Sequence, residues 1–219
     1  MLFRERYEHD LWLIRGSQAW VAAGVAGLFL LALPFLFKGY VVYNFTLFFV
    51  YALVALSLSV LVGLTGQVSL GHAGFLAAGA YAQAVLVSQG VPFLLALPLT
   101  IALVALLGVV IGVPALRLEG PYLAIATLGF GLAIQQILNN WRLVGASTGM
   151  LVERPVLFGV DLYGDTPYYY LVLAVAGVTT WALFNLERSH VGRAFRATRD
   201  ADLASQMSGI GLARYKTLA

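Results

Sequence analysis

The residues best suited to chemistry lie in one glycine-rich interruption between two apolar runs. The stretch from Gly63 to Phe75 carries four polar side chains, Thr65, Gln67, Ser69 and His72, together with four glycines. A break in a membrane helix frees backbone N–H and C=O groups, which are tolerated at membrane depth where the backbone lines a cavity. The stretch therefore fits the lining of a solute path, and it fits equally well an ordinary turn at the membrane surface.

His72 is the one titratable side chain in a long uncharged region, and an ionisable group in a membrane is by default a functional candidate. We favour a structural role, because Ser69 and nearby backbone groups could satisfy the imidazole. A serine-hydrolase site built on Ser69 and His72 is disfavoured. Such a site needs a carboxylate that orients the histidine, and the apolar spans offer neither a carboxylate nor a second histidine.

A second group of functional residues lies near the end of the chain. Asp200 precedes a short stretch, 201–208, with Asp202 in its first turn and Gly209 after it, and these residue types are typical of the two ends of a helix. Met207 lies four residues after Leu203, so the two side chains share one face.

This predicted helix presents a small apolar face flanked by arginines 196, 199 and 214. It could dock a soluble partner protein, or it could lie on lipid headgroups that attract its basic residues. The residues alone leave both possibilities open.

Several other sites are excluded by composition. There is no cysteine, so no disulfide or cysteine-ligated metal is expected. Gly211–Thr217 is a poor phosphate loop because Tyr215 stands where a glycine is needed. We expect no cofactor. Thirteen Lys and Arg are ordinary for the connections of a membrane protein, so the basic residues do not indicate a nucleic acid partner.

The composition of the chain indicates that membrane-spanning helices position these residues. Of the residues, 61% are hydrophobic and only 11% are charged, against about 25% charged in soluble domains. No Asp, Glu, Lys or Arg occurs from Gly39 to Leu116. Lipid on all sides explains this best, and it dictates helices because unpaired backbone groups cannot face hydrocarbon.

We therefore predict an all-α, polytopic membrane protein with about six transmembrane helices. Each crossing needs about 20 residues. The first apolar stretch is interpreted as a helix and not as a removed signal peptide. The predicted spans are Ala19–Phe37, Val41–Val62, Ala73–Ser88, Phe93–Val113, Tyr122–Asn140 and Pro167–Leu186.

Basic residues predict the orientation, because cytoplasmic connections are enriched in them. With the N-terminus inside, ten of the thirteen Lys and Arg lie on the inner side, and only Lys38, Arg142 and Arg154 lie outside. The predicted organisation is a cytoplasmic tail at 1–18, a transmembrane domain at 19–187 and a cytoplasmic segment at 188–219.

Three segments together resemble the permease subunit of bacterial branched-chain amino acid ABC importers. They are Gly66-Gln-Val-Ser-Leu-Gly-His-Ala-Gly-Phe75, Leu116-Arg-Leu-Glu-Gly-Pro-Tyr-Leu-Ala-Ile-Ala-Thr-Leu-Gly-Phe130, and Val191-Gly-Arg-Ala-Phe-Arg-Ala-Thr-Arg-Asp-Ala-Asp-Leu-Ala-Ser205 with Gly209-Ile210. Each motif is weak by itself, and their common order makes the resemblance fairly specific. It covers 66–216. The chain departs from the family at Val144-Gly-Ala-Ser147, where a Thr-Gly-Gly stretch is common.

The resemblance implies an importer in the bacterial inner membrane, driven by ATP that partner chains hydrolyse, so this chain is not itself expected to be an enzyme. The implied partners are a second homologous permease, two cytoplasmic ABC ATPases, an extracytoplasmic solute-binding protein and membrane lipid. Family members continue beyond a segment like Ala213–Lys216, so we expect this chain to be C-terminally truncated. The alternatives are a urea or short-chain amide permease of the same family and an ion-coupled secondary transporter.

The resemblance also suggests roles for individual residues. We expect the translocation path to involve Gln67, Ser69, His72, Thr127 and Gln135. The expected ATPase-coupling residues are Gly192, Arg193, Arg199, Asp200, Asp202, Leu203, Met207 and Gly209.

Overall fold

The computed structural model of the chain describes residues 16–115, 118, 120–152, 156–157, 160–161 and 164–218. Most of the predicted N-terminal tail, 1–15, lies outside these described residues, as do Arg117 and Arg154. The long helices are α1 (Gly16–Leu36), α2 (Tyr40–Leu58), α3 (His72–Ser88), α4 (Phe93–Ala115), α5 (Pro121–Asn140) and α6 (Asp165–Arg188). Each coincides with one predicted span, so the prediction of an all-α membrane protein is confirmed.

The helices are apolar around most of their circumference, and large side chains such as Phe35, Val110 and Trp181 are exposed. In lipid such side chains need no protein cover, because hydrocarbon tails are as apolar as they are. Within the described part of the chain, four helices are long and apolar enough to span a membrane: Tyr40–Leu64, Phe93–Pro114, Pro121–Asn140 and Asp165–Arg188. The apolar part of α1, Val21–Leu36, and the 17 residues of α3 are shorter.

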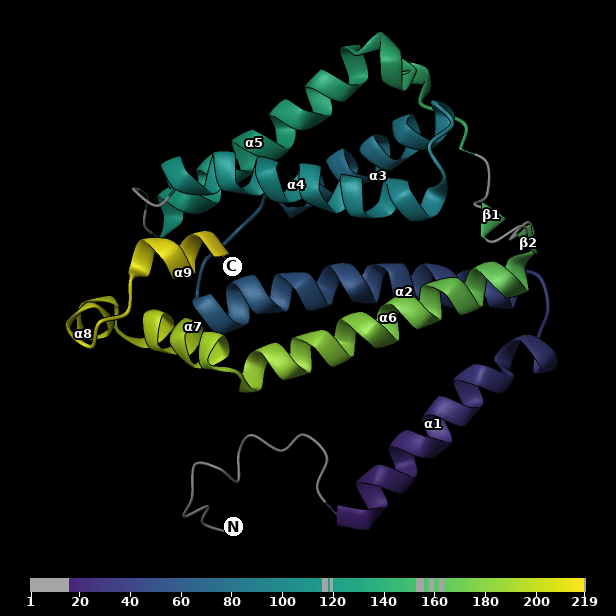
Figure 1. Cartoon of the computed structure of the whole chain (residues 1–219), viewed down its shortest axis with the longest axis horizontal. Coiled ribbons are helices and arrows are strands. Elements are labelled where there is room, and N and C mark those ends of the chain that lie inside the picture. Colours follow the sequence, from purple (N-terminus) through teal and green to yellow (C-terminus); the bar gives the residue numbers. More distant parts are fainter. Residues whose placement is uncertain are drawn as a thin grey trace.

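Successive long helices run in alternating directions and form two groups (Figure 1). Helices α2 and α6 pack side by side, α3 packs against both α4 and α5, and α1 diverges from the first group. Three short helices, α7 (His190–Asp200), α8 (Asp202–Met207) and α9 (Leu212–Leu218), gather at one end. The start of α1 lies toward the same end, as the predicted orientation requires.

The opposite end carries the connection between α5 and α6. It contains two 3₁₀ turns, η3 (Arg142–Val144) and η4 (Ala146–Thr148), followed by the strands β1 (Val156–Leu157) and β2 (Val160–Asp161). The strands pair antiparallel with Val156 opposite Asp161. These two-residue strands are a local hairpin in an otherwise helical chain.

Helix α1 is attached to the bundle near its C-terminal end. Leu33 packs in a buried cluster with Val42 of α2 and Tyr169 of α6. Pro34 lies inside α1 and has no N–H, so the carbonyl of Leu30 loses the donor that a helix normally supplies four residues later. The Tyr169 hydroxyl donates a hydrogen bond of 2.8 Å to that carbonyl. A side chain of α6 thus repairs the backbone gap in α1.

Replacing Tyr169 by Phe should destabilise the protein by about 0.5–1.5 kcal/mol, because the Leu30 carbonyl would lose its donor. Tyr170 is the matched control. Its hydroxyl donates to the carbonyl of Leu31 at 2.7 Å, and that carbonyl keeps its regular helix donor, the N–H of Phe35. Thermal unfolding in detergent should show the larger loss for Tyr169→Phe, and equal losses would contradict this account of the proline gap.

Candidate functional site

The predicted interruption is present and begins inside α2. The helix widens into a π-helical turn, η2 (Ser59–Leu64), and residues 66–71 are not helical. Gly66 has φ of +71°, a left-handed conformation that favours glycine. The next helix, α3, starts at His72, so the break separates two apolar helices at the end of the bundle that carries α7–α9 (Figure 1).

Thr127 of α5 fixes the far side of the break. The backbone N–H of Leu70 donates to its hydroxyl oxygen at 3.0 Å, and that hydroxyl donates to the carbonyl of Ala124 at 2.9 Å. A Cβ added at Gly71 would collide with the Thr127 carbonyl, and one added at Gly74 would lie 2.9 Å from the Gly131 Cα. Thr127 is buried, so it clamps the interrupted segment against α5.

His72 contacts a different serine from the one expected. Its Nε2 lies 2.6 Å from the hydroxyl oxygen of Ser57, two residues before the π-helical turn begins at Ser59. The suggestion that Ser69 satisfies the ring is therefore wrong, although the structural interpretation of His72 gains a specific partner. Ser69 itself is half-buried in the non-helical segment.

A groove of about 450 Å³ lies between α3 and α5. Gln135 and Asn139 supply its polar groups from α5, and Tyr81 adds a hydroxyl from α3. The rest of the lining is small or apolar: Leu70, Ala73, Gly74, Ala77, Leu128, Gly131, Leu132 and Leu138. Of the five expected path residues, only Gln135 lines this groove.

Gln67 lies elsewhere, in a polar pocket of about 320 Å³ beside α7–α9. Its amide nitrogen donates to the Lys216 carbonyl of α9 at 3.1 Å. The same pocket is lined by Arg199, Asp200 and Asp202. The structure therefore groups Gln67 with expected coupling residues, and the five path assignments stay predictions.

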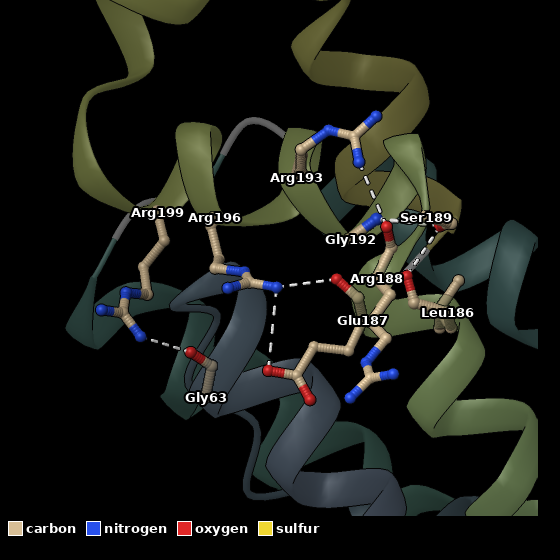
Figure 2. A network of polar contacts seen from close by, with 9 residues as sticks. All are labelled: Gly63, Leu186, Glu187, Arg188, Ser189, Gly192, Arg193, Arg196 and Arg199. Carbon is tan, nitrogen blue, oxygen red and sulfur yellow. Dashed lines mark hydrogen bonds and ion pairs between the residues drawn. The ribbon is translucent and has the colours of Figure 1, made fainter. Parts of the chain in front are cut away.

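Three arginines of α7, spaced three residues apart, bind backbone carbonyls in the last turns of other helices (Figure 2). Arg193 Nη1 donates to the carbonyl of Arg188 at 3.1 Å. Arg196 Nη2 donates to the carbonyl of Glu187 at 2.7 Å and lies 3.7 Å from its carboxylate.

The third, Arg199, donates from Nη1 to the carbonyl of Gly63 in η2 at 2.5 Å. The last carbonyls of a helix lack intrahelical donors and carry partial negative charge, so a guanidinium is a favourable partner. Two of these cations, Arg196 and Arg199, were expected to flank the apolar face of the short helix. The structure adds that all three hold α7 against the ends of α6 and η2.

Helix α7 was not predicted from the sequence, although a signal for it exists. Ser189 caps its start, because its hydroxyl oxygen accepts from the N–H groups of Val191 and Gly192 at 3.1 and 3.3 Å. Gly192, Phe195 and Thr198 recur every three residues and are buried on one face. A Cβ at Gly192 would collide with the carbonyls that end α6. Packing against the end of α6 therefore explains why residue 192 is glycine. The expected part of Gly192 in coupling stays a prediction.

The short helix was predicted correctly in position, but its N-cap was wrong. Asp200 ends α7, and Ala201 occupies the cap position of α8 without a side-chain hydrogen bond. The opposite end agrees with the prediction. Gly209 has φ of +82°, its N–H donates to Gln206, and the next N–H, of Ile210, donates to the Ser205 carbonyl, both at 3.0 Å. This is a Schellman ending.

The remaining expected coupling residues divide into paired and exposed ones. Asp202 Oδ2 pairs with the Lys216 ammonium at 2.6 Å, and Asp200 pairs with its neighbour Arg199 at 3.3 Å. Met207 is 90% exposed, whereas the side chain of Leu203 lies outside the described residues. Among the described residues no group of three His, Cys, Asp or Glu could hold a metal ion.

Replacing Thr127 by Val should loosen the interrupted segment, because the part-buried N–H of Leu70 would lose its acceptor. We expect that amide to exchange with deuterium about tenfold faster. Thr46→Val is the matched control, since Thr46 is also buried but its hydroxyl donates only within α2, to the Val42 carbonyl. Unchanged exchange at Leu70 in Thr127→Val would show that the clamp does not hold the segment.

Comparison with known proteins agrees with this architecture. The chain is 34% identical over 200 residues to the high-affinity branched-chain amino acid transport system permease protein LivM of Salmonella typhimurium, covering 80% of this chain and 47% of that protein. It is 34% identical over 214 residues to LivM of Escherichia coli, covering 86% of this chain and 50% of that protein. The chain thus spans about half the length of these curated relatives. No solved structure matches.

A family profile also matches, over residues 40–219. This range begins at α2 and includes the interrupted segment, the groove between α3 and α5, and α7–α9. The match and the two relatives together show that this multi-pass membrane chain belongs to the family described as the permease component of branched-chain amino acid transport systems.

Proposed function

We propose that this chain forms part of the translocation path of an ATP-driven importer for branched-chain or other small amino acids in the bacterial inner membrane. The names of its two relatives, both branched-chain amino acid permease proteins, support the solute class. The proposal assigns 19–187 to the transmembrane domain and 188–219 to a cytoplasmic segment that couples to the ATPases. ATP hydrolysis then takes place in partner chains.

The observation that carries the proposal is the packing of α7–α9 at one end of the bundle. Phe195 of α7 is buried and contacts the ring of Tyr215 in α9, with centroids 6.3 Å apart. Arg193 and Arg196 bind carbonyls in the last turn of α6. Short helices that are fixed to the long helices in this way are suited to pass a movement of the ATPase on to them. Met207 on α8 offers an exposed apolar contact for a soluble ATPase.

The groove between α3 and α5 suits the proposed solute. Gln135 and Asn139 offer amide donors and acceptors without net charge, which can bind the ammonium and carboxylate of a zwitterion. Apolar neighbours such as Leu128 and Leu132 suit a branched aliphatic side chain better than urea. Amide groups at membrane depth also require protein or water beside them, and a second homologous permease facing α5 supplies that environment.

The remaining partners follow from the same arrangement. The described parts of the connection between α5 and α6, residues 142–152, 156–157 and 160–161, lie at the end of the bundle opposite α7–α9 (Figure 1). They are positioned to receive an extracytoplasmic solute-binding protein, while two ABC ATPases bind the cytoplasmic helices. Each state of the ATPases has to favour a different arrangement of these helices for transport to be driven.

The coupling proposal predicts that Met207→Glu lowers ATPase recovery in a pull-down of the full-length protein from membranes by about tenfold, since a charge would occupy a central apolar contact. Leu151→Glu is the control, because Leu151 is fully exposed and belongs to the connection between α5 and α6, far along the chain from α8. The Leu203→Glu variant tests the other expected contact of α8. Absence of any ATPase in the wild-type sample would refute the importer.

The solute proposal predicts ATP-dependent accumulation of leucine, isoleucine or valine by vesicles that contain the full-length protein with its partner subunits. Gln135→Leu should reduce accumulation by about tenfold, because one polar contact to the zwitterion would be lost. Urea accumulation in its place would identify the amide-transporting branch of the family. Uptake that survives ATP depletion and stops when ion gradients collapse would identify a secondary transporter.

A further inference from the structure

Arg199 contacts both sides of the turn that ends the π-helical part of α2. Its guanidinium donates to the Gly63 carbonyl at 2.5 Å, and its side-chain stem crosses Gly66. A Cβ placed on Gly66 would lie 2.7 Å from the Cγ of Arg199. The arginine therefore replaces the missing backbone donor at the helix end and covers the turn that follows. Figure 2 shows this guanidinium reaching from α7 toward Gly63.

A second connection joins the same turn to α9. Gln67 donates to the Lys216 carbonyl at 3.1 Å, and the Lys216 ammonium pairs with Asp202 of α8 at 2.6 Å. The Lys216 side chain is only 22% exposed, so solvent weakens the Lys216–Asp202 ion pair less than it would weaken a fully exposed ion pair. Two of the three cytoplasmic helices thus bind the interrupted segment directly, and the third, α8, is tied to it through Lys216.

The opposite end of the segment is bound to α5. Leu70 donates its N–H to Thr127, and Gly71 and Gly74 lie in close contact with the backbone at Thr127 and Gly131. Gly131 also lines the groove that contains Gln135. Residues 66–71 therefore form a short, non-helical connection between α7–α9 and this groove, and its two ends are fixed to different partners.

We propose that Arg199 is a positioning residue that ties the interrupted segment 63–71 to α7, so that movement of the cytoplasmic helices moves this segment and, through Thr127, the wall of the groove. The proposal rests on the proposed function, because it assumes that partner ATPases move α7–α9. It assigns Arg199 to a contact within this chain instead of a contact with the ATPase. A chain of contacts shows no coupling by itself, so the test measures movement.

Absence of cysteine from the sequence makes a site-specific test direct. Val68 is 44% exposed within the segment, so in a transporter whose remaining residues and partner subunits have had any reactive cysteine replaced, the alkylation rate of Val68→Cys reports the segment's environment. In the complete, reconstituted transporter, we expect this rate to change between the nucleotide-free and ATP-bound states. In the Arg199→Ala background, the nucleotide-dependent change at Val68→Cys should fall about tenfold.

Two further variants make the result specific. Arg214→Ala removes another exposed cation from the same end of the bundle. Among the described residues Arg214 makes no hydrogen bond to the segment, so this variant should preserve the nucleotide response. Arg199→Lys keeps a cation near the Gly63 carbonyl but cannot reproduce the planar fork, and should retain part of the response. A second thiol, Ala204→Cys on α8, verifies that nucleotide still moves the cytoplasmic helices in the Arg199→Ala protein.

The outcomes separate this inference from the proposed function. Loss of the response at Val68→Cys, with the response at Ala204→Cys intact, supports the role of Arg199. Retention of both responses in Arg199→Ala overturns it while leaving the importer in place. If the wild-type complex contains no ATPase, or if nucleotide changes neither thiol in the otherwise wild-type transporter, the proposed function fails and the inference fails with it.

Discussion

A helix that breaks inside or at the edge of a membrane exposes backbone groups that protein or water has to satisfy, and this structure depends on how protein groups meet that requirement. The carbonyl of Gly63 and the N–H of Leu70 lie on the two sides of one break. The first accepts from Arg199 and the second donates to Thr127. Because these partners belong to α7 and α5, satisfying the break also joins the short helix α7 to the long helices α2, α3 and α5.

Much of the architecture could be predicted from the sequence because lipid imposes simple rules. The absence of charge from Gly39 to Leu116 and the apolar runs after it located the long helices to within a few residues. Gly209 predicted the end of α8, since few residues other than glycine adopt φ of +82° there without strain. The family could likewise be recognised from three short motifs, the first of which includes the interruption.

The contacts that define the candidate site could not be predicted from the sequence as well as the helices could. Arg199 and Gly63 are separated by 136 positions, and no local pattern indicates that a surface cation will bind so distant a carbonyl. Asp200 looked like an N-cap because its residue type suits one, yet α7 continues through it and the cap falls on Ala201. Side-chain type predicted which residues matter at this end of the bundle, whereas their partners depend on how α7 packs.

The bond from Tyr169 to Leu30 has a consequence for the order in which the protein is made. Residue 30 leaves the ribosome long before residue 169, and domains are synthesised from the N-terminus onward. Until α6 has been made, the carbonyl left open by Pro34 has no donor from Tyr169, and the buried cluster around Leu33 is incomplete. During synthesis α1 can therefore pack against Val42 of α2 first, and the hydrogen bond that closes the proline gap forms only after α6 has been made.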